Sequence, residues 1–231
     1  HPGLGQSTGY DYTRTNNPTR DILEEGLAAL EGGERAVVTS SGMSAIQLAF
    51  QLFKQGSHIL VLRDLYGGSF RYFNHLEAEN LAQFTYFETE ADFEKLISDD
   101  ISGVFIETPT NPLMQEVDNQ RIADLTHQHK ALLLVDNTLL TPLRQRPLEL
   151  GADIVLYSGT KYLTGHNDIL AGVVVTNDKG MGEKLGWLSN TTGPTLSAFD
   201  CWLFIRSLKT LPIRLDRQEA TAQEIVTWLK Q

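Results

Sequence analysis

The sequence of 231 residues contains a single cysteine, Cys201. One thiol cannot form a disulfide within the chain, so a disulfide-stapled secreted fold is excluded and a reducing compartment such as the cytoplasm is expected. Cys201 lies in the apolar stretch AFDCWLF, and we interpret it as a buried structural thiol in preference to a reactive one. Apolar runs of about 20 residues, which a transmembrane helix needs, are missing. The start also lacks the charged and apolar segments of a signal peptide, so no membrane partner is expected.

Positive charge is also scarce. Lysine and arginine number 19 against 29 aspartates and glutamates, which gives a net charge of −10. This balance argues against a nucleic-acid partner, although it leaves room for a local basic pocket. No G-x-G-x-x-G motif follows the first predicted strand, which excludes a Rossmann dehydrogenase. No His, Cys and Asp residues have the spacing of a metal site, so no metal is expected.

What the sequence does contain is a series of short apolar runs separated by helical patterns. The runs predict strands at 35–40, 58–62, 83–87, 103–107, 131–135, 153–157 and 171–176. Helical patterns cover 19–30, 42–54, 68–80, 91–98 and 118–129, and the chain from about 190 onward. Alternating strands and helices imply parallel pairing. We therefore expect an α/β fold with one seven-stranded, mostly parallel sheet and helices on both faces.

Polar motifs follow most of these strands at the point where each one ends. They are SSGMSA, DLYGGS, TPTNP, DNT and SGTKY, after the first, second, fourth, fifth and sixth strands. Ligands bind beyond the carboxyl ends of the strands in such sheets. The sequence therefore predicts a ligand site on one rim, with small polar groups, an aromatic ring, an aspartate and a lysine.

Each of these rim residues allows two interpretations when it is taken alone. Gly42 opens a predicted helix, where free N–H groups can bind a phosphate, with Ser158 and Thr160 as further donors; equally, a capped helix start needs a glycine in a tight turn. Asp136 can pair with a protonated heterocyclic nitrogen, or it can make a local cap or turn. Tyr66 can stack on a planar ring, or it can be an ordinary aromatic of the rim.

Lys161 gains its meaning from these neighbours. A lone lysine after a strand is usually a surface residue. Near a phosphate site, however, a second cationic centre would lower the pKa of this lysine and make it a nucleophile. Pyridoxal 5′-phosphate needs a lysine for its aldehyde, a carboxylate for its ring nitrogen, a phosphate site and a stacking partner. The combination predicts this cofactor.

Six segments together resemble the Cys/Met-metabolism family of pyridoxal-phosphate enzymes. They are YDYTRTNNPTRDILEEGLAALEGG, SSGMSA, DLYGGSFR, ETPTNPL, VDNT and SGTKYLTGHNDILAGVVV, and the resemblance runs from about Gly9 to the end. It implies the aspartate-aminotransferase-like fold (fold type I) and a homo-oligomer, a tetramer built from dimers that share active sites. It also implies that the small C-terminal domain is largely absent, and both ends of the chain look cut. The expected parts are an N-terminal arm (1–18) on a neighbouring subunit, a cofactor domain (19–205) and the start of a link (206–231).

The resemblance implies a role for each matching residue. Lys161 is the Schiff-base lysine, which then moves protons between substrate carbons, and Asp136 keeps the pyridine nitrogen protonated. Tyr66 stacks on the ring and takes part in catalysis. The phosphate and the 3-hydroxyl contact the remaining residues of the pocket, which are Gly42, Met43, Asn111, Ser158 and Thr160.

Three further residues match positions at the edge of the family's site. Tyr12 and Arg14 match a pair that reaches the cofactor phosphate of the neighbouring subunit. Arg71 matches an arginine near the distal end of the substrate, or it is an arginine on a helix surface. His166 lies close to Lys161 in the sequence, and we interpret it as structural.

Members of this family differ in the reaction that they catalyse on amino-acid substrates. The stretches STGYDYTRTNNPTR and ETPTNPLMQEVD resemble bacterial cystathionine γ-synthases and O-acetylhomoserine thiol-lyases, which implies γ-replacement on an O-acylhomoserine by cysteine or another thiol. Gly68 stands where methionine γ-lyases commonly have a cysteine. The alternatives are β- or γ-elimination of the cystathionine lyase type and, in another class, an inactive fragment that acts only in subunit association.

Overall fold

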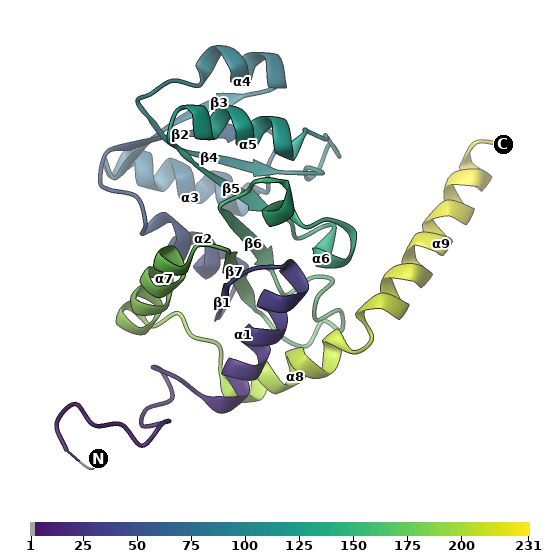
Figure 1. Ribbon diagram of the computed structural model, residues 1–231. Coiled ribbons are helices and arrows are strands. Elements are labelled where there is room, and N and C mark those ends of the chain that lie inside the picture. The colour runs from purple at the N-terminus through teal and green to yellow at the C-terminus, as the bar shows by residue number, and fades with distance from the viewer. Residues whose placement is uncertain (1–2) are drawn as a thin grey trace.

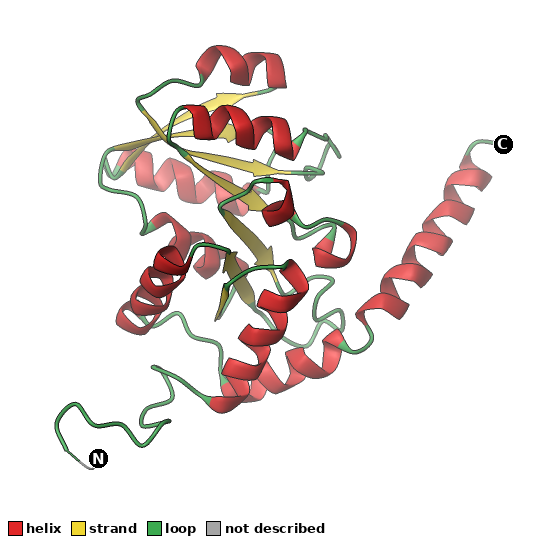
Figure 2. Ribbon diagram, in the orientation of Figure 1, coloured by secondary structure: helices red, strands yellow, loops and turns green. Residues whose placement is uncertain are grey.

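The computed structural model describes residues 3–231 and contains one seven-stranded sheet (Figures 1 and 2). Its order is β1-β7-β6-β5-β4-β2-β3. Only β7 runs antiparallel to its neighbours, β1 and β6, so the predicted mostly parallel sheet is confirmed. The strands are β1 (Arg35–Thr39), β2 (Ser57–Leu62), β3 (Ala82–Phe87), β4 (Ile101–Glu107), β5 (Leu132–Asp136), β6 (Ile154–Ser158) and β7 (Gly172–Thr176).

Helices cover both faces of this sheet, as predicted. Successive strand residues point into two separate apolar cores: Val37 and Leu134 into one, Val38 and Leu133 into the other. Strands buried on both faces read as continuous apolar runs, which explains the sequence pattern. The helices are α1 (Pro18–Glu31), α2 (Gly42–Phe50), α3 (Gly67–Ala78), α4 (Glu90–Leu96), α5 (Asn119–Gln128), α6 (Thr141–Arg144), the 3₁₀ helix η1 (Pro147–Leu150), α7 (Lys179–Thr192), α8 (Ala198–Leu208) and α9 (Leu211–Leu229).

Helix α7 begins well before the helical region that the sequence predicts from about residue 190. It contains Gly180, Gly182 and Gly186, and glycine lowers helix propensity, which hid the pattern. The glycines have a packing reason. A Cβ on Gly182 would lie 2.7 Å from Cβ of Arg35, which is closer than a normal van der Waals contact. Glycine at this position therefore lets α7 lie close against β1.

Both ends of the chain project from the body of the molecule (Figure 1). In α9 only Leu211 and Leu215 are buried. Its exposed apolar residues are Ile213, Ile225, Val226, Trp228 and Leu229. None of the helices within residues 3–231 is long and apolar enough to cross a membrane. The boundaries at 18/19 and 205/206 stay predictions.

Candidate active site

A cleft of about 1000 Å³ lies at the carboxyl ends of the parallel strands. The ends of β1, β2, β4, β5 and β6 contribute to it because strands that run in the same direction finish on the same edge of the sheet. The cleft brings together most of the residues predicted from the sequence, namely Gly42, Met43, Tyr66, Asn111, Asp136, Ser158, Thr160 and Lys161. Residues from β1, β2, β4, β5 and β6 therefore meet in one place.

The N-terminus of α2 faces this cleft and is capped as the local interpretation predicts. Ser41 and Ser44 form a reciprocal capping box, in which the Ser44 N–H donates to Oγ of Ser41 at 3.0 Å. The cap leaves the N–H groups of Gly42 and Met43 at the first two helical positions, where no intrahelical acceptor exists. A Cβ on Gly42 would lie 3.0 Å from Cα of Ser158, so glycine is needed for α2 to meet the end of β6. The two interpretations of Gly42 are compatible.

Asp136, the last residue of β5, borders the cleft and makes a local turn. Its Oδ1 accepts hydrogen bonds from the Thr138 N–H at 3.0 Å and from the Thr138 hydroxyl at 2.6 Å. Burial raises the pKa of its carboxyl group. A cationic partner in the cleft, such as a protonated ring nitrogen, would stabilise the charged form of this buried carboxyl group.

Glu107 is a second buried carboxyl group at this site, and the sequence reasoning did not find it. It ends β4 and lies opposite Asp136 in the strand register. Its side chain accepts a hydrogen bond from the Tyr66 N–H at 3.0 Å. Burial, and next the charge of Asp136, raise the pKa of Glu107 to about 8. The signal was present in the sequence: GVFIE ends an apolar strand on a carboxyl group, as LLLVD does.

Lys161 is exposed in the cleft on a loop with a fixed backbone. Its carbonyl accepts from the Gly165 N–H at 2.8 Å, and its own N–H donates to the Ser158 carbonyl at 3.3 Å. Thr160 ties the same loop to β7, since its Oγ1 accepts from the Ala171 N–H at 3.1 Å and donates to the Ala171 carbonyl at 3.3 Å. The Thr160 hydroxyl is therefore engaged within the chain.

The ring of Tyr66 lies over a backbone that has no side chain beneath it. A Cβ on Gly68 would stand 2.4 Å from a ring carbon of Tyr66 and 3.1 Å from the sulfur of Met43. His166 does not border the cleft; its Nδ1 contacts the Thr164 carbonyl at 2.5 Å. That contact within the loop is what the structural interpretation of His166 predicts.

Three predicted site residues lie apart from the cleft within the described chain. Arg14 stacks over the ring of Tyr12 at 5.1 Å and hydrogen-bonds Asn190 of α7. Arg71 is exposed on α3 and does not border the cleft. The structure thus gathers the residues for the ring and phosphate, while Tyr12, Arg14 and Arg71 keep their roles only as predictions.

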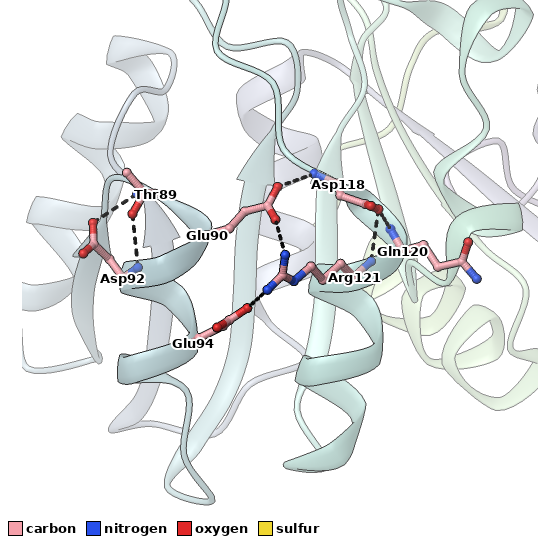
Figure 3. A network of polar contacts seen from close by, with 7 residues as sticks. All are labelled: Thr89, Glu90, Asp92, Glu94, Asp118, Gln120 and Arg121. Atoms are coloured by element: carbon pink, nitrogen blue, oxygen red, sulfur yellow. Dashed lines mark hydrogen bonds and ion pairs between the residues drawn. The ribbon is translucent and has the colours of Figure 1, made fainter.

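A second hollow, of about 570 Å³, lies on the surface between α4 and α5. Glu90 and Glu94 of α4 both pair with Arg121 of α5, and the Asp118 N–H donates to Glu90 at 2.8 Å (Figure 3). Asp118 in turn caps α5 through the N–H groups of Gln120 and Arg121. These contacts join two helices, and their carboxylates are already paired or used as caps.

The cleft fits pyridoxal 5′-phosphate on the chemistry of its donors. Helix α2 presents N–H groups for a phosphate, Asp136 a buried carboxyl group for a ring nitrogen, and Lys161 an amine for an aldehyde. Tyr66 adds an aromatic face. The cleft volume of about 1000 Å³ lies at the upper end of the range for small-molecule sites, so the cofactor and an amino-acid substrate both find room.

Known proteins resemble the chain over its whole length. The cystathionine γ-synthase/O-acetylhomoserine (thiol)-lyase of Bacillus subtilis is 49% identical, over 100% of this chain and 62% of that protein. The cystathionine γ-synthase of Haemophilus influenzae is 46% identical, over 100% of the chain and 63% of that protein. The cystathionine β-lyase of Lactococcus lactis subsp. cremoris is 41% identical, over 99% and 60%.

A solved structure agrees equally well. Cystathionine γ-lyase from Lactobacillus plantarum, complexed with L-serine, matches with a TM-score of 0.96 and 40% identity, over 100% of this chain and 61% of that one. The chain therefore spans about 60% of the length of its relatives. Its sheet and helices have the fold type I architecture of these enzymes, as predicted. The model of the family described as Cys/Met metabolism PLP-dependent enzyme matches residues 2–231, and the chain belongs to that family.

Proposed function

We propose that this chain forms the cofactor-binding part of a trans-sulfuration enzyme that catalyses γ-replacement on an O-acylhomoserine. The observation that carries the proposal is the meeting of Lys161, Asp136 and the α2 N-terminus in one cleft. Bound pyridoxal phosphate supplies an electron-accepting ring, conjugated to the α carbon of the amino-acid substrate. The residues of this chain hold that ring and move the protons.

Each residue of the cleft has one task in this proposal. The N–H groups of Gly42 and Met43, with the Ser158 hydroxyl, bind the phosphate at the positive end of α2. The Thr160 hydroxyl would have to leave the Ala171 carbonyl to join them as a further donor. Asp136 keeps a proton on the pyridine nitrogen, because a buried carboxylate stabilises a cation next to it.

The remaining groups act on the ring and on the substrate. The ring of Tyr66 stacks on the pyridine and its hydroxyl serves as an acid or base, while Asn111 orients the 3-hydroxyl. Nζ of Lys161 would hold the aldehyde of the cofactor, and as a free amine it would take a proton from one substrate carbon and return it to another. Arg71 lies toward the distal end of the substrate.

The rest of the proposal concerns partners and place. Tyr12 and Arg14 reach the phosphate site of a second copy, so that the active form is a homo-oligomer, a dimer or a tetramer built from such dimers. In that position Arg14 adds a charge-assisted contact to the phosphate. The single thiol, Cys201, is buried and suits a reducing compartment, and we place the enzyme in the cytoplasm.

γ-Replacement is favoured over elimination by the relatives with the highest quoted identities. Those at 49% and 46% carry synthase names, whereas a cystathionine γ-lyase of Bacillus subtilis is 43% identical. These differences are modest, so elimination of the β- or γ-lyase type is the second candidate. An inactive fragment that serves only subunit association is less well supported, because the cleft keeps its lysine, its carboxylate and its helix N-terminus.

A direct comparison of reactions tests the proposal. The complete protein is supplied with cysteine and either O-acetylhomoserine or O-succinylhomoserine, and cystathionine is quantified. In parallel it is supplied with cystathionine alone, and the 2-oxo acid and ammonia are measured. We expect cystathionine formation to dominate. Faster release of 2-oxo acid from cystathionine would favour the lyase candidate, and no reaction together with no bound cofactor would favour the inactive fragment.

A further inference from the structure

Glu107 is a buried carboxyl group that the roles above leave unused. It is 9% exposed, it ends β4, and it borders the cleft. Burying a carboxyl group costs free energy unless hydrogen bonds replace those lost to water. Glu107 makes such contacts with neighbouring loops.

Two loops lie side by side at this edge because β2 and β4 are neighbours in the sheet. The loop after β2 carries Asp64 and Tyr66, and the loop after β4 carries Asn111. Glu107, at the end of β4, reaches across and accepts the Tyr66 N–H at 3.0 Å. Its carboxylate is also stabilised by the backbone N–H of Asn111.

A second carboxylate joins the same loops from the opposite side. Oδ2 of Asp64 accepts the N–H of Leu113 at 3.1 Å and the hydroxyl of Thr110. One acidic side chain thus runs from β4 to the loop after β2, and another runs from that loop back to the loop after β4. We call Asp64 and Glu107 the carboxylate latch.

Glu107 also lies beside the buried carboxyl group of Asp136. Glu107 and Asp136 lie opposite each other on neighbouring strands, and two charges so close in a buried place repel. Asp136 receives two hydrogen bonds from Thr138, which favour its charged form. The pKa of Glu107 is raised to about 8. Burial raises the pKa of Asp136 as well, so both carboxyl groups gain from a cationic partner in the cleft.

We propose that Glu107 is a positioning residue for the cofactor: it fixes the backbone of Tyr66 beside that of Asn111 at the edge of the cleft. The proposal rests on the assignment of the cleft to pyridoxal phosphate. It concerns residues of this chain, so cofactor affinity tests it directly, without turnover.

The test compares three variants of the complete protein by titrating the cofactor-free form with pyridoxal 5′-phosphate. Glu107→Ala removes the acceptor and should weaken binding about tenfold or more, because the part-buried Tyr66 N–H loses its partner. Glu107→Gln keeps an acceptor oxygen for this N–H and should bind within about threefold of wild type. The matched control is Glu88→Gln, an exposed glutamate paired with Arg63, which should leave affinity unchanged.

A double-mutant cycle with Tyr66→Ala shows whether Glu107 acts through Tyr66. If it does, Glu107→Ala should cost much less affinity on the Tyr66→Ala background than on wild type. The cofactor's induced circular dichroism should shrink in Glu107→Ala and recover in Glu107→Gln. Should Glu107→Ala fail to fold, Asp64→Ala removes the acceptor on the other side of the latch and should weaken binding severalfold.

Three results would overturn the proposal: wild-type affinity in Glu107→Ala, full additivity with Tyr66→Ala, or equal loss in Glu107→Gln and Glu107→Ala. If Glu107→Ala does not fold, wild-type affinity in Asp64→Ala would overturn it as well. Failure of wild type itself to bind the cofactor at Lys161 would instead refute the proposed function.

Discussion

At the scale of single residues, the chemistry proposed for this chain is concentrated at the ends of certain strands and in the loops that follow them. β5 ends on Asp136 and β4 on Glu107, and the loop after β6 carries Lys161. An apolar strand that ends on a charged residue brings that charge to the edge of the core, where its pKa shifts. This local rule connects the sequence to the cleft.

Asp136→Asn tests the role of the carboxylate at the ring nitrogen. The amide has the same shape, but it carries no negative charge to hold a proton on the pyridine. We expect the variant to bind the cofactor and to lose at least about a hundredfold in turnover, or roughly 2.7 kcal/mol of barrier.

Stopped-flow or steady-state rates of the complete protein measure this loss, with the exposed Asp124→Asn as control. Activity of Asp136→Asn within a few-fold of wild type would show that Asp136 has no such role.

Sequence reasoning found the residues that follow strands and missed those whose role depends on contacts between loops. Lys161, Asp136, Tyr66 and Gly42 were predicted because each follows an apolar run directly. Glu107 was missed because its function depends on β2 lying beside β4, and strand order is not written in the local sequence.

At the scale of elements, the start of α9 is hydrogen-bonded to the loop that carries Lys161. The guanidinium of Arg214 donates to the carbonyls of Tyr162 at 2.6 Å and Leu163 at 3.3 Å, and to the Ser207 carbonyl in α8 at 3.1 Å. Gly165 lies against it with a φ of +67°, and a Cβ there would meet the guanidinium at 2.0 Å. The bend between α8 and α9 is therefore coupled to the site.

Arg214→Gln should weaken this contact. Loss of hydrogen bonds to buried carbonyls typically costs about 1–3 kcal/mol, so we expect a lower free energy of unfolding and faster release of the cofactor. Arg214→Lys should rescue only part of the loss, since an ammonium lacks the planar fork that reaches several carbonyls.

Urea unfolding and cofactor release rates provide the readouts, and Arg217→Gln, one turn along the exposed face of α9, is the control. Equal stability and equal release in Arg214→Gln and Arg217→Gln would contradict the coupling of α9 to the loop.

The elements themselves were predicted well where apolar runs were continuous. Each of the seven strands was found within two residues at either end, because strands buried on both faces have no alternation to obscure them. The start of α7 was not predicted, because its glycines lower the helix propensity of the segment. Gly182 and Gly186 lie against Arg35, so glycine is needed there for packing.

At the scale of the whole molecule, three glutamates link stability to pH: Glu31 and Glu107 are buried, and Glu24 is partly buried. Burial is the first cause in each case, and it raises the pKa of Glu24 to about 7, of Glu31 to about 8 and of Glu107 to about 8. A group whose pKa is higher in the folded state binds more protons there than in the unfolded chain. Its contribution is complete below the unfolded pKa of about 4.3 and is lost as pH rises through the folded value.

The cofactor-free protein should therefore become less stable as pH rises from 5 to about 9. Glu31→Gln should flatten this dependence in part, because it replaces one of the three proton-binding groups with an amide that does not titrate. Glu31 is buried, and its Oε2 accepts a hydrogen bond from the Tyr157 hydroxyl. Free energies of unfolding by urea at several pH values measure it. A stability that rises over this interval, or an unchanged slope in Glu31→Gln, would contradict the assignment of these protons.

Sharing of sites between subunits is the second prediction at this scale. Arg14→Ala and Lys161→Ala proteins should each be poorly active. When their subunits exchange, some dimers contain one site with both wild-type residues, and activity should rise toward about a quarter of wild type if the sites act independently. Subunit exchange is verified by mass, and the exposed Arg217→Ala replaces Arg14→Ala in the control mixture. No recovery despite exchange would place Arg14 outside the partner's site.

The most direct test of the central claim is to locate the cofactor on the chain. The complete protein is loaded with pyridoxal 5′-phosphate, reduced with borohydride, digested and analysed by mass spectrometry. The account predicts a phosphopyridoxyl group on the peptide that contains Lys161, and no label together with no cofactor absorbance in Lys161→Ala, while Lys179→Ala behaves as wild type. A stoichiometric label on any other lysine would contradict it.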